Sequence, residues 1–133
     1  LPTAGYTLEK LSLPQMQKPI LVIDASGQGR HRDNWRIFYP DVDAVLFVID
    51  STDTKRIAIL KKCIEDFLSD PLLEKANIPI MFAMNKQDKL DAVDKEDLKD
   101  LIGFEKFRKY TKKKWNVKET SGYSGMGVGE TFE

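Results

Sequence analysis

The chain has 133 residues, of which 41% are hydrophobic and 32% are charged, so its size and composition are those of one globular domain and exclude a disordered or fibrous protein. Lysine plus arginine and aspartate plus glutamate each number 21, and this balance argues against nucleic acid or an anionic membrane as a partner of the whole surface. The single cysteine, Cys63, excludes an internal disulfide framework and is typical of a reducing compartment.

The first predicted strand is PILVI (19–23), whose continuous apolar character is typical of a strand buried on both faces of a sheet. It ends at Asp24 and leads into the loop DASGQGRHRDNW (24–35). At a strand end, Asp24 is a hard oxygen ligand suited to Mg²⁺ through a water, because Mg²⁺ dehydrates reluctantly. Gly27 would let a backbone N–H approach a phosphate oxygen, and Gln28 would orient an attacking water. The alternative interpretation is a flexible glycine-rich loop.

The second predicted strand is AVLFVI (44–49), and an amphipathic helix is expected to follow it. Between residues 55 and 69, apolar side chains recur at spacings of three and four and therefore share one helix face. The residues on this face are Ile57, Leu60, Ile64, Phe67 and Leu68. Pro71 would end the helix. Asp50, which ends the strand, is either part of a ligand site or an ordinary turn former before STD.

The third predicted strand, IPIMFAM (78–84), leads directly into the tetrapeptide NKQD (85–88). A carboxylate only accepts hydrogen bonds, so Asp88 would take both the N1–H and the 2-amino group of a guanine. Adenine would leave this charge unpaired, and such a site rejects the wrong base strongly. Asn85 would tie neighbouring loops together, and the stem of Lys86 would lie along the base. The alternative is a polar turn after a buried strand.

A second helix is expected after Asp94, which can cap its N-terminus. Leu98, Leu101 and Ile102 mark its apolar face, and Gly103 suits its end.

Strands that alternate with helices predict an α/β fold built from βαβ units with right-handed crossovers. In such a sheet a ligand binds outside the carboxyl ends of the strands. Asp24, Asp50 and Asn85 are therefore expected to share one crevice.

These residues resemble the small GTPases of the ADP-ribosylation factor (Arf) and Arf-like group, and the resemblance covers nearly the whole chain in order. PTAGY (2–6) resembles the switch I segment of that group, DASGQ (24–28) the entry to switch II, and NKQD the guanine motif. The resemblance implies a Ras-like P-loop GTPase fold, with a mostly parallel sheet and helices on both faces. It also implies GTP or GDP and Mg²⁺ as ligands, and Mg-dependent GTP hydrolysis as the activity.

The resemblance assigns a role to each matched residue. Thr3 would bind Mg²⁺ and sense the γ-phosphate, Asp24 would hold the metal through water, and Gln28 would be the catalytic residue that positions the hydrolytic water. Trp35 would belong to the effector surface, and Tyr123 departs from the family pattern. The GTP-binding residues would be Thr3, Asp24, Gly27, Asn85, Lys86, Asp88 and Gly122, the last through its backbone N–H.

Within the group, Ser26 and SGQGR (26–30) resemble the Arf-like branch that recruits the Bardet–Biedl coat complex to ciliary membranes. The implied partners are an effector protein or coat complex, an exchange factor and a GTPase-activating protein, with no nucleic acid. The implied location is the cytoplasm, extending to the cilium and to peripheral attachment at membranes.

A phosphate loop, G-x-x-x-x-G-K-[ST], does not occur in residues 1–133, and the family carries it before switch I. We therefore expect a single GTPase domain that is incomplete at both ends and inactive alone, with membrane association only through a preceding segment. The alternative hypothesis is a nucleotide-free structural or adaptor module inside a larger assembly. A phospho-accepting receiver domain is a third hypothesis, but the acidic pair that it needs is not seen.

Overall fold

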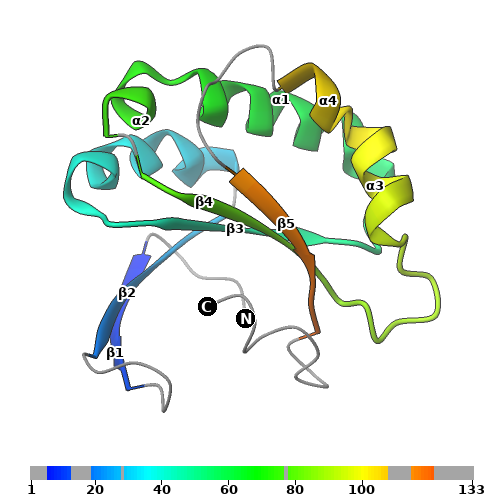
Figure 1. Cartoon of the computed structure of the whole chain (residues 1–133), viewed down its shortest axis with the longest axis horizontal. Helices are drawn as coiled ribbons and strands as arrows, with labels where there is room; N and C mark the ends of the chain where they lie inside the picture. The colour runs from blue at the N-terminus through cyan, green and yellow to red at the C-terminus, as the bar shows by residue number, and fades with distance from the viewer. Residues whose placement is uncertain (1–5, 13–18, 28, 77, 108–114, 122–133) are drawn as a thin grey trace. The chain divides into compact units, whose positions relative to one another are not determined.

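The computed structural model describes residues 6–12, 19–27, 29–76, 78–107 and 115–121. The chain divides into two compact units, Leu1–Tyr39 and Pro40–Glu133, and each is described by itself (Figure 1). Three predicted site residues, Thr3, Gln28 and Gly122, lie outside the described residues. Within the described ranges, no helix has both the length and the apolar character needed to span a membrane.

The first unit is built on an antiparallel pair of strands, β1 (Tyr6–Leu11) and β2 (Ile20–Ala25). The predicted strand at 19–23 is confirmed as β2, but the expectation that it is buried on both faces is wrong, because Leu21 is 65% exposed and none of residues 20–25 is fully buried. The strand β1 was not predicted because its charged residues interrupt the apolar pattern. A 3₁₀ helix, η1 (Gly29–Asp41), follows β2 and is far longer than most helices of this type. The ring of Tyr6 packs edge-on against Phe38 of η1, with centroids 5.1 Å apart, and so joins the strand pair to the helix.

The second unit contains a parallel sheet in the order β3 (Val45–Asp50), β4 (Ile80–Asn85) and β5 (Trp115–Glu119). The central strand β4 is buried along most of its length, as its apolar run predicted. On β3 the expectation of burial on both faces is wrong, because Leu46 and Val48 are 42% and 57% exposed. Only the face of β3 that carries Phe47 and Ile49 is buried. The fold is nevertheless α/β with a mostly parallel sheet, as expected.

Helices lie above this sheet (Figure 1), and a core of aromatic side chains joins the two layers. Phe82, at the middle of β4, is fully buried and lies at the centre of the cluster. Its ring centroid is 5.0 to 6.4 Å from four other aromatic rings, and each pair is tilted or edge-on. These rings belong to Phe47, Phe67, Phe104 and Trp115. The cluster therefore fixes all three strands against the helices that carry Phe67 and Phe104.

The first helix of this unit confirms the predicted amphipathic segment. A short 3₁₀ turn, η2 (Thr54–Arg56), leads into α1 (Ile57–Ser69), whose buried residues are Ile64, Phe67 and Leu68. The helix ends before Pro71, as expected, but Pro71 also begins a further helix, α2 (Pro71–Ala76). Proline is favoured at a first helical position because its missing N–H has no partner there anyway. Pro71, which predicted the end of one helix, is therefore also the first residue of the next helix.

The helix after Asp94 is α3 (Lys95–Ile102), and a short helix α4 (Phe104–Phe107) follows it. The Asp94 side chain accepts a hydrogen bond from the N–H of Asp97 at 2.9 Å, and Gly103 closes the helix in the left-handed conformation with φ of 80°. Both predicted caps are thus confirmed. Leu101, however, is 46% exposed, because it lies at the edge of the stripe formed by the buried Leu98 and Ile102.

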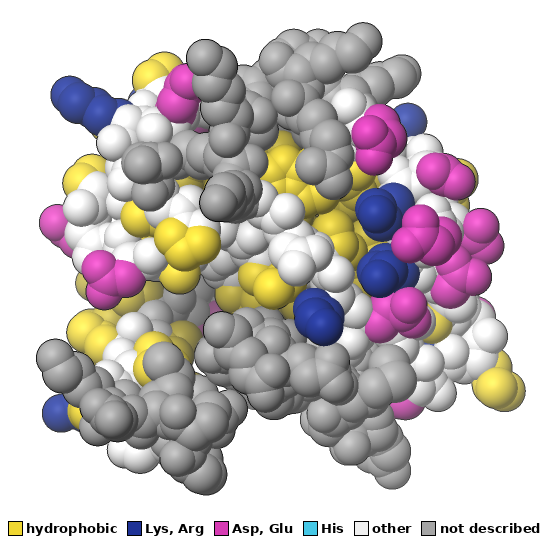
Figure 2. Space-filling view, in the orientation of Figure 1, with side chains coloured by type: hydrophobic (Ala, Val, Ile, Leu, Met, Phe, Trp, Pro, Cys, Tyr) yellow, Lys and Arg dark blue, Asp and Glu magenta, His cyan; other side chains and the backbone are white. Residues whose placement is uncertain are grey.

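The surface over α3 and the loop before it carries side chains of both charges (Figure 2). Asp and Glu side chains gather there with Lys and Arg side chains among them. The exposed acidic residues of this stretch are Asp91, Asp94, Glu96, Asp97 and Asp100. This side of the molecule therefore presents a mixed surface rather than a field of one sign.

The N-cap of α3 provides a test of the fold. We expect Asp94→Ala to lower the free energy of unfolding of the full-length protein by about 1 kcal/mol, because the N–H of Asp97 loses its acceptor. Urea denaturation measures this change. Asp91→Ala removes an exposed carboxylate three residues earlier and serves as the control. Equal effects of the two substitutions would contradict a capping role.

Candidate functional site

Three segments meet at the carboxyl ends of the parallel strands in the second unit. The register places Asp50 of β3 opposite Asn85 of β4, and backbone bonds extend this pairing past the strand ends. The N–H of Ser51 donates to the carbonyl of Asn85 at 3.1 Å, and the N–H of Gln87 donates to the carbonyl of Thr120 at 3.1 Å. Loop residues after β3, β4 and β5 are therefore held together by the same ladder that forms the sheet.

The ends of the NKQD motif are fixed by hydroxyl groups from the segment after β5. The Thr120 hydroxyl donates to Asn85 Oδ1 at 3.1 Å, so Asn85 ties two loops together as predicted. The Ser121 hydroxyl donates to Asp88 Oδ1 at 2.7 Å. Ser121 is fully buried, whereas Asp88 is exposed. A carboxylate has about four acceptor positions, so this bond orients Asp88 and leaves room for two further N–H donors.

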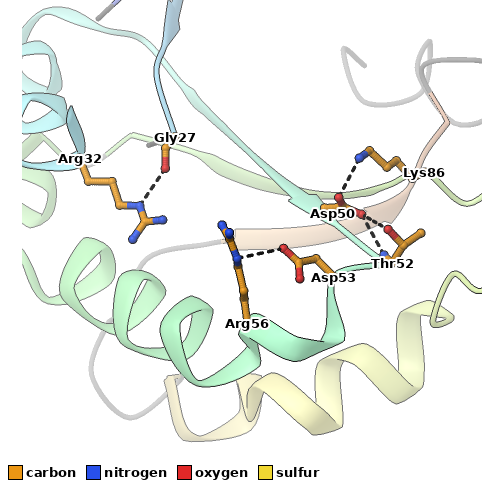
Figure 3. Close-up of polar contacts among 7 residues, drawn as sticks. All are labelled: Gly27, Arg32, Asp50, Thr52, Asp53, Arg56 and Lys86. Atoms are coloured by element: carbon orange, nitrogen blue, oxygen red, sulfur yellow. Dashed lines mark hydrogen bonds and ion pairs between the residues drawn. The ribbon is translucent and has the colours of Figure 1, made fainter. Parts of the chain in front are cut away.

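Lys86 is held by Asp50, a residue whose role the sequence left open (Figure 3). Lys86 Nζ donates to Asp50 Oδ2 at 2.7 Å, while the other oxygen of Asp50 accepts from the N–H and the hydroxyl of Thr52 at 2.9 and 2.7 Å. Among the described residues other than glycine, only Lys86 has a positive φ, of 66°. Asp50 therefore belongs to the site, as the acceptor that fixes the direction of the Lys86 side chain.

The charges of this pair stabilise each other. Partial burial opposes ionisation of Asp50, but hydrogen bonds from Lys86 and Thr52 outweigh it and hold the pKa of Asp50 below its usual 3.8. The hydrogen bond to Asp50, helped by its negative charge, raises the pKa of Lys86 above 10.5. Both groups are therefore charged at neutral pH.

The first unit carries the predicted phosphate-facing residues. Asp24, near the end of β2, is exposed and lies opposite Thr7 of β1. The space around Gly27 is open, since an added Cβ would meet no atom within 4 Å. Arg32 Nε donates to the carbonyl of Gly27 at 2.9 Å (Figure 3). Gly27 thus offers backbone without a side chain in the way, as its assignment requires.

Trp35 binds the backbone next to Gly27, so it is more than a surface residue. Its indole N–H donates to the carbonyl of Ser26 at 2.8 Å, and the side chain is half-buried. The peptide between Ser26 and Gly27 is planar, so holding its carbonyl toward Trp35 points the N–H of Gly27 the other way. Trp35 therefore sets the direction of the N–H that was predicted to meet a phosphate.

The shared crevice of Asp24, Asp50 and Asn85 stays a prediction, because Asp24 lies in the first unit and the other two in the second. Asp50 and Asn85 are brought together as expected. Within the described ranges, no group of three acidic, histidine or cysteine side chains forms a metal site. Of the two predicted Mg²⁺ ligands, Asp24 lies within the described residues and Thr3 outside them, so the metal site stays a prediction. Sequence reasoning missed Thr120 and the serine contact to Asp88; the signal was their position directly after a strand.

The family is decided by comparison with known proteins. The model of the ADP-ribosylation factor family matches residues 1–133. The chain belongs to the ADP-ribosylation factor family. This confirms the resemblance found in the switch and guanine motifs.

The known relatives of this Arf chain are longer than the chain itself. ADP-ribosylation factor-like protein 6 of Danio rerio is 36% identical over 88 residues, which are 66% of this chain and 46% of that protein. ADP-ribosylation factor F of Dictyostelium discoideum is 29% identical over 133 residues, 100% of this chain and 67% of that protein. ADP-ribosylation factor-like protein 1 of Saccharomyces cerevisiae is 31% identical over 132 residues, 99% and 68% respectively. The chain thus spans about half to two thirds of their lengths.

Among solved structures, the Arl6 BBS3 small GTPase of Trypanosoma brucei with bound GppNp matches with a TM-score of 0.86 and 26% identity. The match covers 99% of this chain and 77% of that one. It confirms the expected small GTPase fold.

The Asp50–Lys86 pair predicts a specific pH dependence of stability. Because the folded pKa of Asp50 is lowered, its contribution is present above 3.8 and is lost as the pH falls through the lowered value. The contribution of Lys86 is present below 10.5 and is lost as the pH rises through its raised pKa. We expect Asp50→Asn to lower stability at neutral pH and to flatten the decline in acid, measured by urea denaturation at several pH values.

Asp53→Asn is the matched control for this experiment. Asp53 pairs more loosely with Arg56, at 3.7 Å, and both side chains are exposed (Figure 3). Its substitution is expected to change the acid decline little. A decline that is identical in Asp50→Asn and the wild type would show that the pair does not contribute.

Proposed function

We propose that the full-length protein is a GTP-binding molecular switch of the Arf-like group, with Mg-dependent GTP hydrolysis that controls effector recruitment in intracellular or ciliary membrane traffic. The observation that carries this proposal is the fixed, exposed carboxylate of Asp88 at the carboxyl end of a parallel sheet, oriented by Ser121. Membership of the family and the GppNp-bound structural relative support the same conclusion.

Base recognition follows from the chemistry of Asp88. Its carboxylate accepts only, and guanine presents two donors side by side, N1–H and the 2-amino group. Ser121 occupies part of one carboxylate oxygen and leaves the remaining acceptor positions for the base. Lys86, held at its far end by Asp50, would lay its apolar stem along the base. Gly122 would add its backbone N–H to the guanine O6.

Residues of the first unit would bind the phosphates of the nucleotide and detect the γ-phosphate. Asp24 and Thr3 would hold Mg²⁺, which would neutralise phosphate charge when bound. The N–H of Gly27 would donate to the γ-phosphate, and Gln28 would position the hydrolytic water. Trp35 and Arg32 bind the carbonyls on either side of the Gly27 N–H, so a movement of this backbone would change η1 directly. This link supports an effector surface at Trp35 that differs between the GTP and GDP forms.

The proposed partners are those of a regulated switch. An effector or coat complex would bind the GTP form, an exchange factor would release GDP, and a GTPase-activating protein would supply a missing catalytic arginine. We place the protein in the cytoplasm and cilium, with peripheral membrane attachment through a segment that precedes switch I. Nucleic acid is not among the partners we propose.

Base choice tests the proposal most directly. We expect Asp88→Asn in the full-length protein to weaken GTP binding by about tenfold or more, because a charged hydrogen bond to the base is lost. Relative affinity for xanthosine triphosphate should rise, since its 2-oxo group needs a donor. Calorimetric titration measures both, with Asp91→Asn in the same loop as the control. Wild-type protein that binds ATP as tightly as GTP would contradict base recognition by Asp88, and wild-type protein that binds neither nucleotide would favour the adaptor hypothesis.

The hydrolysis step gives a second test. Gln28→Leu is expected to slow hydrolysis stimulated by the activating protein by orders of magnitude and to leave nucleotide affinity nearly unchanged, because Gln28 would act in the transition state. Single-turnover phosphate release measures the rate. Intrinsic hydrolysis of the wild type should already be slow. Fast turnover by the isolated protein would contradict this assignment.

A further inference from the structure

Gln87, the residue inside NKQD to which no role has been assigned, is bonded to three separate segments. Its side-chain nitrogen donates to Ser51 Oγ at 2.9 Å and to the carbonyl of Val93 at 3.1 Å. Its backbone N–H donates to the carbonyl of Thr120 at 3.1 Å. Gln87 therefore joins the end of β3, the far end of its own loop and the segment after β5.

Ser51 makes this arrangement rigid. It is fully buried, and each of its polar groups has a partner. Its N–H donates to the carbonyl of Asn85 at 3.1 Å, its carbonyl accepts from the N–H of Val93 at 3.0 Å, and its Oγ accepts from Gln87. The loop from Gln87 to Val93 is thereby closed against a buried anchor at the end of β3.

Asp88 depends on this closure for its position. It is exposed, and its hydrogen bond from Ser121 orients the carboxylate but leaves the backbone of the loop to decide where the carboxylate lies. The remaining bonds of the loop are local turns, from Lys89 to Lys86 and from Ala92 to Lys89. Gln87 directly precedes Asp88, and its side chain bonds to the buried Ser51 at the end of β3. It therefore ties the backbone beside Asp88 to the buried part of the sheet.

We propose that Gln87 is a specificity-determining positioning residue, which places the Asp88 carboxylate where it can accept the 2-amino group of guanine. The inference rests on the proposed function and extends it to a residue that does not touch the base. The chemistry of the position favours glutamine, because one nitrogen must donate two hydrogens to two acceptors. A glutamate of the same size would place an acceptor against the carbonyl of Val93.

The test compares binding of GDP and inosine diphosphate to the full-length protein. Inosine keeps the N1–H and O6 of guanine but lacks the 2-amino group, so the ratio of the two dissociation constants reports on that contact alone. In Gln87→Glu we expect the preference for GDP to fall about fivefold, the equivalent of one hydrogen bond. Lys89→Gln changes the charge of the same loop by the same amount, at an exposed side chain, and should keep the wild-type ratio.

Ser51→Ala and the double variant complete the experiment. Ser51→Ala removes one acceptor of Gln87 and should lower the preference in the same direction, and the double variant should lose less than the sum of the two effects. Ser51→Ala also keeps the proposal testable if Gln87→Glu does not fold.

The outcomes separate this inference from the proposed function. Equal weakening of GDP and inosine diphosphate in Gln87→Glu and Ser51→Ala, with the ratio unchanged, would overturn the positioning role and leave a structural one. Wild-type protein that does not prefer GDP to ADP would overturn the proposed function itself. A reduced ratio in both variants, with Lys89→Gln unaffected, would support the positioning role.

Discussion

Hydrogen bonding of the central strand β4 to a parallel neighbour on each side is the constraint on which the candidate site depends. Parallel pairing with β3 places Asp50 beside Asn85, and pairing with β5 brings Thr120 to the same edge. Strand pairing alone therefore brings together the polar residues that follow the strands. The aromatic cluster around Phe82 keeps this alignment, because it packs all three strands against the helices at once.

Side chains at this edge are oriented by partners from neighbouring segments before any ligand arrives. Asp50 holds Lys86, Thr120 holds Asn85, and Ser121 holds Asp88. Such preorganisation matters for a charged group that must recognise a base, because the cost of ordering it is met during folding rather than during binding. The partly buried Asp50 stays ionised because its bonds to Lys86 and Thr52 outweigh the unfavourable effect of burial.

In the first unit, side chains of η1 bind backbone carbonyls of the loop after β2. Trp35 and Arg32 bind consecutive carbonyls at Ser26 and Gly27, and this leaves the N–H of Gly27 directed away from the indole. A 3₁₀ helix of this length has poorer internal hydrogen bonds than an α-helix.

The sequence by itself determined the fold class, the family and most of the residue types of the site, because these depend on local patterns. The apolar runs at 44–49 and 78–84 and the caps Asp94 and Gly103 are visible within a few residues, and so is NKQD. The strands β1 and β5 were not predicted, since charged residues break their apolar pattern. The helix α2 escaped because its first residue, Pro71, is also a signal for the end of a helix.

Only the tertiary structure decided which partner each polar side chain of the site has. The partners of Lys86, Asn85, Asp88 and Gln87 lie 36, 35, 33 and 36 residues away, at Asp50, Thr120, Ser121 and Ser51. No local pattern connects residues at such separations, because strand pairing alone brings them to one edge. The exposure of Leu46 and Val48 was hidden for the same reason: an apolar run shows that a strand can be buried, whereas the layers packed on the sheet decide which face is.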